Sequence, residues 1–251
     1  MNEEPTTTLP APRVPRHRLS VRIAHWVNVI VFLTLVFSGI AILLAHPRLY
    51  WGEDGYYGDP AWLSLPLPEK LDYTGWGRSL HFLAAWLLVF NGAAYLLSGL
   101  INQHLLRRML PTRVQLKLDN IRQDIRDHLR LKVHASSGDY NFMQKLAYLT
   151  VIFVLFPTIL LTGLTMSPAV TAAWPWLFDL FGGRQSARTI HFLAASSLVL
   201  FVLVHLFQVI LVGFRKEVGD MITGGRADPA GRHADATAPG QTHSHDRETP
   251  R

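Results

Sequence analysis

The sequence predicts an all-α integral membrane protein: a four-helix bundle with an amphipathic cytoplasmic loop helix and disordered termini. Composition is the first observation behind this prediction, because 49% of the 251 residues are hydrophobic and only 17% are charged, which is apolar for a soluble chain of this size. The second is the uneven placement of charge. Four long segments contain no Asp, Glu, Lys or Arg, and they cover residues 23–46, 79–106, 146–178 and 189–214.

Each charge-free segment is long enough to cross a bilayer as a helix. Crossing takes roughly 20 apolar residues, and the segments contain 24, 28, 33 and 26 residues. The first is too long for a cleavable signal peptide and lacks a small-residue cleavage site, so we expect an uncleaved span. In the third, Ser167 and Pro168 predict the end of the span, and the following AVTAAWPW is expected at the membrane interface.

The basic residues predict the orientation. Lys and Arg number 4 in residues 1–22, 9 in 101–145 and 6 in 215–251, but only 3 in 47–78 and 2 in 169–188. The positive-inside rule therefore places both termini and the middle loop in the cytoplasm. We expect the membrane to be the bacterial inner (plasma) membrane. The net charge of +6 then reflects this topology and attraction to anionic lipid, with no nucleic acid as a partner.

We expect three parts along the chain. Residues 1–20 form a mobile cytoplasmic N-terminus, residues 21–218 the transmembrane domain, and residues 219–251 a cytoplasmic tail that is disordered because Gly, Pro and polar residues dominate it. In the middle loop, apolar residues recur at helical spacing among basic ones. This favours an amphipathic helix on the cytoplasmic leaflet or, equally, a surface helix of a small loop domain. Its apolar positions are Val114, Leu118, Ile121, Ile125 and Leu129.

The two external connections are rich in aromatic residues. An interfacial belt accounts for some of them, and the excess on one side of the membrane also suits a docking surface for an external partner. The residues are Trp51, Trp62, Trp76, Trp174 and Trp176, together with Tyr50, Tyr56 and Tyr57.

Histidine is the candidate ligand in this chain. Cysteine is absent, which excludes disulfides, thiolate-bound iron–sulfur clusters and covalently attached haem. The pentapeptide HFLAA begins at His81 and again at His191, each time three residues after an arginine, and His25 follows Arg22 at the same distance. His205 lies deep in the last apolar segment, where a polar ring is costly without a partner.

The spacing of these histidines predicts two metal sites. His191 and His205 are 14 residues apart, about 21 Å along a helix and within about 40° around its axis, so both lie on one face. The last helix thus offers a ligand at two depths. His81 matches the external depth and His25 the cytoplasmic depth. Two stacked bis-histidine sites are what two b-type haems require, since iron in a porphyrin leaves two axial positions.

Three arginines accompany three of these histidines. Arg22, Arg78 and Arg188 each lie on the face of the neighbouring histidine, one turn nearer water, where they would contact haem propionates. The alternative is that they only end the spans by snorkelling. An alternative also exists for the histidines: in a permease-like membrane protein without haem, they would line a proton path. A proton path does not require two histidines 14 residues apart on one face of a helix.

At this point the sequence resembles a known family. It is similar to the di-haem cytochrome b membrane subunits of bacterial nickel–iron hydrogenases, formate dehydrogenases and thiosulfate reductases. Its motifs resemble those of the thiosulfate-reductase type most. The resemblance covers about residues 18–218. Its motifs are RIAHW at 22–26, RSLHF at 78–82, YNFMQK at 140–145, TGLTMSP at 162–168 and ARTIHF…VLVH at 187–205.

The resemblance implies which residues bind cofactors. In this family one histidine from each of the first two helices and two from the fourth bind the haems, which corresponds to the four histidines named above. Quinone reacts near the cytoplasmic haem, close to the start of the third helix, which implicates Asn141 and Gln144. These two also have the spacing of a helix-capping box, so a purely structural role is the alternative. The middle loop, roughly 40 residues long, departs from the family pattern.

The resemblance also implies the role of the chain. It would be an electron-transfer subunit of a respiratory complex rather than a stand-alone enzyme. Two haem b groups would carry electrons between the membrane quinone pool and a periplasmic catalytic oxidoreductase subunit of the molybdopterin or nickel–iron type. The protein would position and tune the cofactors.

Overall fold

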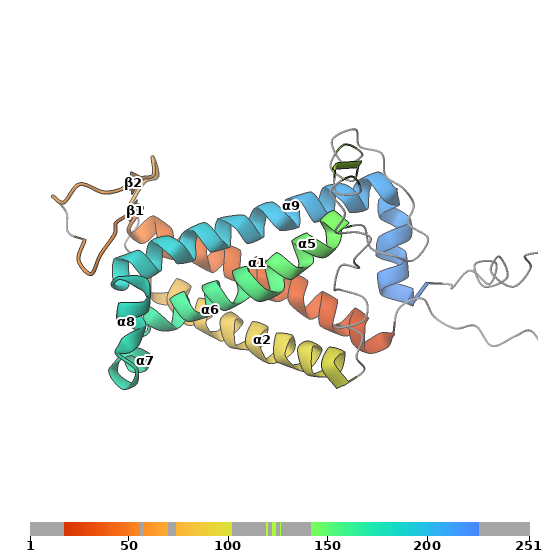
Figure 1. Cartoon of the computed structure of the whole chain (residues 1–251), viewed down its shortest axis with the longest axis horizontal. Coiled ribbons are helices and arrows are strands. Elements are labelled where there is room, and N and C mark those ends of the chain that lie inside the picture. Colours follow the sequence, from red (N-terminus) through yellow and green to blue (C-terminus); the bar gives the residue numbers. More distant parts are fainter. Residues whose placement is uncertain are drawn as a thin grey trace, which may run out of the picture.

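The protein is a bundle of four long helices, seen here in a computed structural model (Figure 1). The structure describes residues 18–55, 58–69, 74–101 and 142–225, with four isolated positions in between at 119, 122, 123 and 126. Five apolar positions of the predicted amphipathic loop helix, Tyr56, Tyr57, Asn141 and most of the two predicted disordered termini lie outside the described residues.

All four predicted spans are present as helices long and apolar enough to cross a membrane. The first two are α1 (Leu19–Ala45) and α2 (Thr74–Ile101). The third is built from α5 (Phe142–Thr150), a π-helical segment η2 (Val151–Leu155) and α6 (Phe156–Thr165). The fourth lies within α9 (Arg184–Thr223). The all-α membrane fold predicted from the sequence is therefore confirmed, and the protein is a multi-pass membrane protein.

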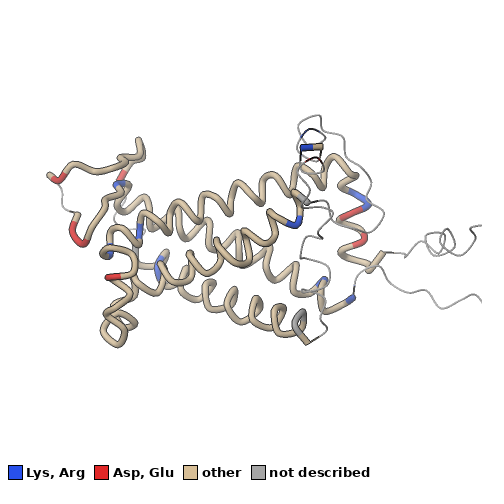
Figure 2. The backbone as a smooth tube through the Cα atoms, in the orientation of Figure 1, with Lys and Arg blue, Asp and Glu red and all other residues tan. Residues whose placement is uncertain are grey.

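Charge separates the ends of the bundle from its middle. Figure 2 shows Lys, Arg, Asp and Glu gathered at the two ends of the helices, with an uncharged band between them. Within that band large apolar side chains point outward, as Ile30, Phe37, Phe90 and Leu200 do, all more than 60% exposed. Side chains buried between helices are mostly small, such as Ala41, Ala84 and Ala194. This is the pattern of helices that pack closely and face lipid.

The third span contains one irregular turn, which Pro157 explains. Proline has no backbone N–H, so the regular hydrogen-bond ladder cannot pass through it. Just before it, the N–H of Phe156 bonds to the carbonyl of Val151, five residues back instead of four. This π-helical turn is a common way for a helix to absorb such an interruption.

Short elements cover one end of the bundle. Helices α7 (Pro168–Ala173) and α8 (Trp176–Phe181) follow α6, where the sequence predicted an interfacial segment. A two-residue antiparallel pair, β1 (Arg48–Leu49) with β2 (Leu63–Ser64), lies at the same end of the bundle (Figure 1) and was not predicted. Its loop reaches α9, where the carbonyl of Gly52 accepts hydrogen bonds from the N–H groups of Gln185 (3.0 Å) and Ser186 (3.2 Å). These two N–H groups belong to the first turn of α9, so they have no acceptor within the helix itself.

At the opposite end α9 turns back toward α1 (Figure 1). The turn is at Gly213, whose φ of 128° suits glycine. The helix continues to Thr223, so the predicted domain boundary at residue 218 falls inside it. The carbonyl of Met221, one of the orphan acceptors of this helix end, accepts hydrogen bonds from Arg22 Nε (3.2 Å) and Trp26 Nε1 (3.3 Å).

Candidate functional site

The structure brings His81 and His191 together between the helices. The centroids of their rings are 6.2 Å apart, at an interplanar angle of 61°. Two imidazoles that bind one metal ion through nitrogen, each at about 2 Å, have centroids about 6 Å apart. The ring separation therefore matches the value for two rings on opposite sides of one metal, and two nitrogen ligands are the number that iron in a porphyrin leaves to the protein.

Each of these rings has a hydroxyl partner that the sequence analysis missed. Ser38 of α1 lies 3.0 Å from Nδ1 of His81, and Thr162 of α6 lies 3.0 Å from Nδ1 of His191. Both hydroxyl residues are fully buried. A sequence pattern could have indicated these partners. A serine or threonine followed by glycine occurs in the span before each HFLAA copy, as Ser38-Gly39 and Thr162-Gly163.

The partners of the two hydroxyls indicate which ring nitrogen carries the proton. The Ser38 hydroxyl donates to the carbonyl of Thr34 (2.6 Å), and the Thr162 hydroxyl donates to that of Thr158 (2.6 Å). A hydroxyl has one proton, so toward the histidine each oxygen acts as the acceptor. Nδ1 of each ring is then the donor, and Nε2 keeps the free lone pair that a metal needs.

His25 and His205 are placed differently. His25 is half-buried on α1, and its ring makes an edge contact with Trp26 (5.4 Å between centroids). His205 is exposed on α9. Near His25, α1 and α2 are linked by Asn91, which donates to Asn28 Oδ1 (2.8 Å) and to the carbonyl of Ala24 (3.0 Å). The sequence analysis missed this polar contact.

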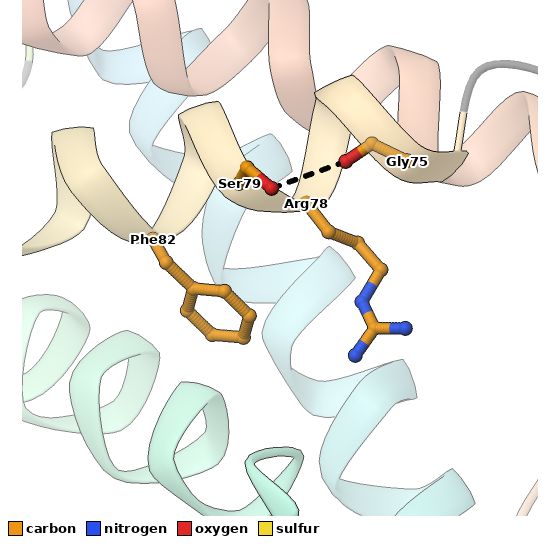
Figure 3. A pocket seen from close by; sticks show the side chains of 4 residues that line it. All are labelled: Gly75, Arg78, Ser79 and Phe82. Atoms are coloured by element: carbon orange, nitrogen blue, oxygen red, sulfur yellow. Dashed lines mark hydrogen bonds between the residues drawn. The ribbon is translucent and has the colours of Figure 1, made fainter.

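The three arginines have different surroundings. Arg78 is exposed and lines a hollow of about 310 Å³ with Gly75, Ser79 and Phe82, as Figure 3 shows. Arg22 bonds to the end of α9, as described above. Arg188 donates to the carbonyl of His46. Burial, and then the charge of Arg188, lower the pKa of the His46 imidazole.

The structure describes six of the aromatic residues predicted for the external surface and corrects one of them. The five tryptophans are each about half exposed. Tyr50, however, is buried at 3% exposure and does not belong to that surface, because its ring stacks on His46 and its carbonyl accepts a hydrogen bond from Thr189 (2.7 Å). At the start of the third span, Gln144 is half-buried beside the buried Lys145.

Fold and site together define a class of protein: a four-span membrane protein that places histidines of different helices side by side. The chain belongs to the prokaryotic cytochrome b561 family, whose model matches residues 16–224. It is 35% identical over 196 residues to the "Putative protein-methionine-sulfoxide reductase subunit YedZ1" of Azospira oryzae, which covers 76% of this chain and 88% of that protein. No solved structure matches.

Family membership gives the cofactor and the general role. The chain is a membrane electron-transfer subunit that contains haem b, and the family predicted from the histidine motifs is confirmed. The particular resemblance to the thiosulfate-reductase type stays a prediction.

Proposed function

We propose that the chain carries electrons through two b-type haems between the membrane quinone pool and a periplasmic oxidoreductase. The contact between His81 and His191 is the observation that carries this proposal. When bound, haem iron supplies a reversible one-electron couple. The chain's own residues hold the group, keep it away from water and adjust its potential.

The first haem is assigned to the His81–His191 site. Support comes from the ring separation and from the protonation of Nδ1, which leaves Nε2 of both rings for the iron. Arg78 lies one turn from His81 near the start of α2, beside the hollow in Figure 3, and would bind a haem propionate there. Arg188 is assigned the same role from α9. Its present bond to the His46 carbonyl uses only part of its five N–H donors.

The second haem is assigned to His25 and His205, and Arg22 would contact its propionates. The support is the regular geometry of α9, whose only non-helical backbone angles lie at Gly213, beyond His205. The 14 residues from His191 to His205 therefore keep helical spacing, and both rings lie on one face at two depths. An exposed histidine within an apolar span is costly unless a ligand covers it.

Quinone is assigned to the end of the bundle that carries His25. Gln144, near the start of the third span, would hydrogen-bond to a quinone carbonyl, and Asn141 is proposed beside it. The distribution of basic residues supports cytoplasmic termini in the bacterial inner membrane, and hence a cytoplasmic quinone site. Anionic lipid would meet the basic residues on that side.

The partner is assigned to the opposite end. The relative from Azospira oryzae is named as a putative reductase subunit, which supports a catalytic partner for this chain too. We assign this partner to the molybdopterin or nickel–iron type. The exposed tryptophans around α7, α8 and the β1–β2 loop suit protein docking, because aromatic residues are enriched at such interfaces.

The haem content of the purified protein tests the proposal. We expect two haems per chain, both removed by acid–acetone extraction, because no cysteine is present to attach them covalently. The measurement is the pyridine haemochrome spectrum against protein mass. One haem in a well-folded preparation would remove the second site from the proposal, and none would favour the permease-like alternative.

Cross-linking in cells tests the docking surface. A photo-activated cross-linker at Trp62 or Trp174 is expected to capture the catalytic subunit, because both side chains are about half exposed at that end of the bundle. The control position is Ile222, which is 55% exposed near the end of α9. Capture from Ile222 alone would contradict the assigned face or the orientation.

A further inference from the structure

We propose that Ser38 and Thr162 are positioning residues that tune the external haem through its two ligands. This inference rests on the proposed function, since it takes His81 and His191 as the ligands. It concerns two side chains that are not ligands themselves.

Both hydroxyls are held in place by the same local geometry. Each lies toward the C-terminal end of its span and donates its proton to the carbonyl four residues earlier. Each is also fully buried, at 0% exposure. A hydroxyl that donates to this carbonyl offers the ring a lone pair in a constant direction.

The two contacts are equivalent in the two halves of the bundle. Ser38 of α1 meets a histidine of α2, and Thr162 of α6 meets a histidine of α9. In both cases the next residue is a glycine against the same ring: a Cβ at Gly39 would lie 3.6 Å from His81 Cε1, and one at Gly163 would lie 3.4 Å from His191 Cε1. Hydroxyl, glycine and histidine thus form one arrangement that occurs twice.

Such an acceptor has a defined effect on a metal-bound imidazole. Nδ1–H donation fixes the ring orientation and makes the other nitrogen a stronger electron donor. A stronger donor stabilises ferric over ferrous iron, which lowers the midpoint potential. Because both axial ligands of one site have this acceptor, the external haem should be tuned by two hydroxyls at once.

The experiment separates the hydroxyl from the shape of the side chain. In the purified holoprotein, Thr162→Val keeps the volume and removes the hydroxyl, whereas Thr162→Ser keeps the hydroxyl and removes a methyl. Ser38→Ala tests the other ligand. Ser197→Ala is the matched control, because Ser197 also donates to the carbonyl four residues earlier (2.9 Å) but contacts no histidine in the described residues.

The readouts are haem content and the midpoint potential of each haem in an optical redox titration. Thr162→Val and Ser38→Ala should each weaken the preference for ferric iron about tenfold at the external haem, which raises its midpoint potential by about 59 mV. Thr162→Ser and Ser197→Ala should keep the wild-type potentials. Loss of one haem in Thr162→Val but not in Thr162→Ser would also support the proposal.

Three results would overturn it. Unchanged potentials in both Thr162→Val and Ser38→Ala would show that the hydroxyls do not act on the iron. Equal losses in Thr162→Val and Thr162→Ser would show that Thr162 matters only for packing. In both cases wild-type protein still contains its haems, so the proposed function stands. Wild-type protein without haem would instead remove the proposed function and this inference together.

Discussion

Replacing His81 or His191 by alanine is expected to remove the same haem and leave the other in place. Their rings lie 6.2 Å apart and would share one iron, so loss of either ring leaves that iron with a single axial ligand. Each variant should therefore hold one haem instead of two. The measurement is haem content together with an optical redox titration, which should show the same remaining component in both variants.

The other two histidines provide the reciprocal test. His25→Ala and His205→Ala should resemble each other, keep the external haem and lose quinone reactivity. His46→Ala is the control, because His46 lies beyond the end of α1 and should leave both haems bound. A match between His25→Ala and His191→Ala would contradict the pairing. It would mean that α1 runs through the membrane in the opposite sense, and would overturn the assigned orientation too.

The largest loss of stability is expected from Gly183→Ala. Gly183 has a φ of +105°, and a Cβ there would lie 2.4 Å from the Gly52 carbonyl oxygen. That oxygen accepts the hydrogen bonds that begin α9, from Gln185 and Ser186. Backbone strain, overlap and the lost hydrogen bonds together should cost about 3 kcal/mol or more. The free energy of unfolding can be measured by titration with a denaturing detergent.

Gly58→Ala separates strain from overlap. Gly58 also has a positive φ, of +125°, but nothing lies within 4 Å of a Cβ built there. This variant has only the backbone strain, so about 1 kcal/mol is expected. Equal losses in the two variants would contradict the argument, because the contact with Gly52 would then contribute nothing.

The four spans could be predicted from sequence because one physical condition decides them. A bilayer requires about 20 uncharged residues for a helical crossing, and that requirement is visible in a single sequence. Exact ends were less predictable. Arg184, Arg188 and Arg215 are helical, so α9 extends beyond the charge-free segment at both ends. Charged residues end the part of a helix that lies in lipid without ending its hydrogen-bond ladder.

The site was predictable only in part. His81 and His191 could be paired from the sequence alone, because both lie at the external depth of their spans. Ser38 lies 43 residues from its histidine and Thr162 lies 29 residues from its own, and serine and threonine are ordinary residues within membrane helices. Which hydroxyl meets which ring depends on the rotation of one helix against the next. That rotation follows from packing of small side chains, which spacing along one chain does not reveal.

The bonds to the Met221 carbonyl have a consequence for how the protein is made. Arg22 and Trp26 enter the membrane with the first helix, but their acceptor is 199 and 195 residues further along the chain. At a synthesis rate of about 5–20 residues per second, it emerges roughly 10–40 s later. During this time the first helix must remain in place without its partner at that end. Insertion of the helices and closure of the bundle are therefore separate events, and the second waits for nearly the whole chain.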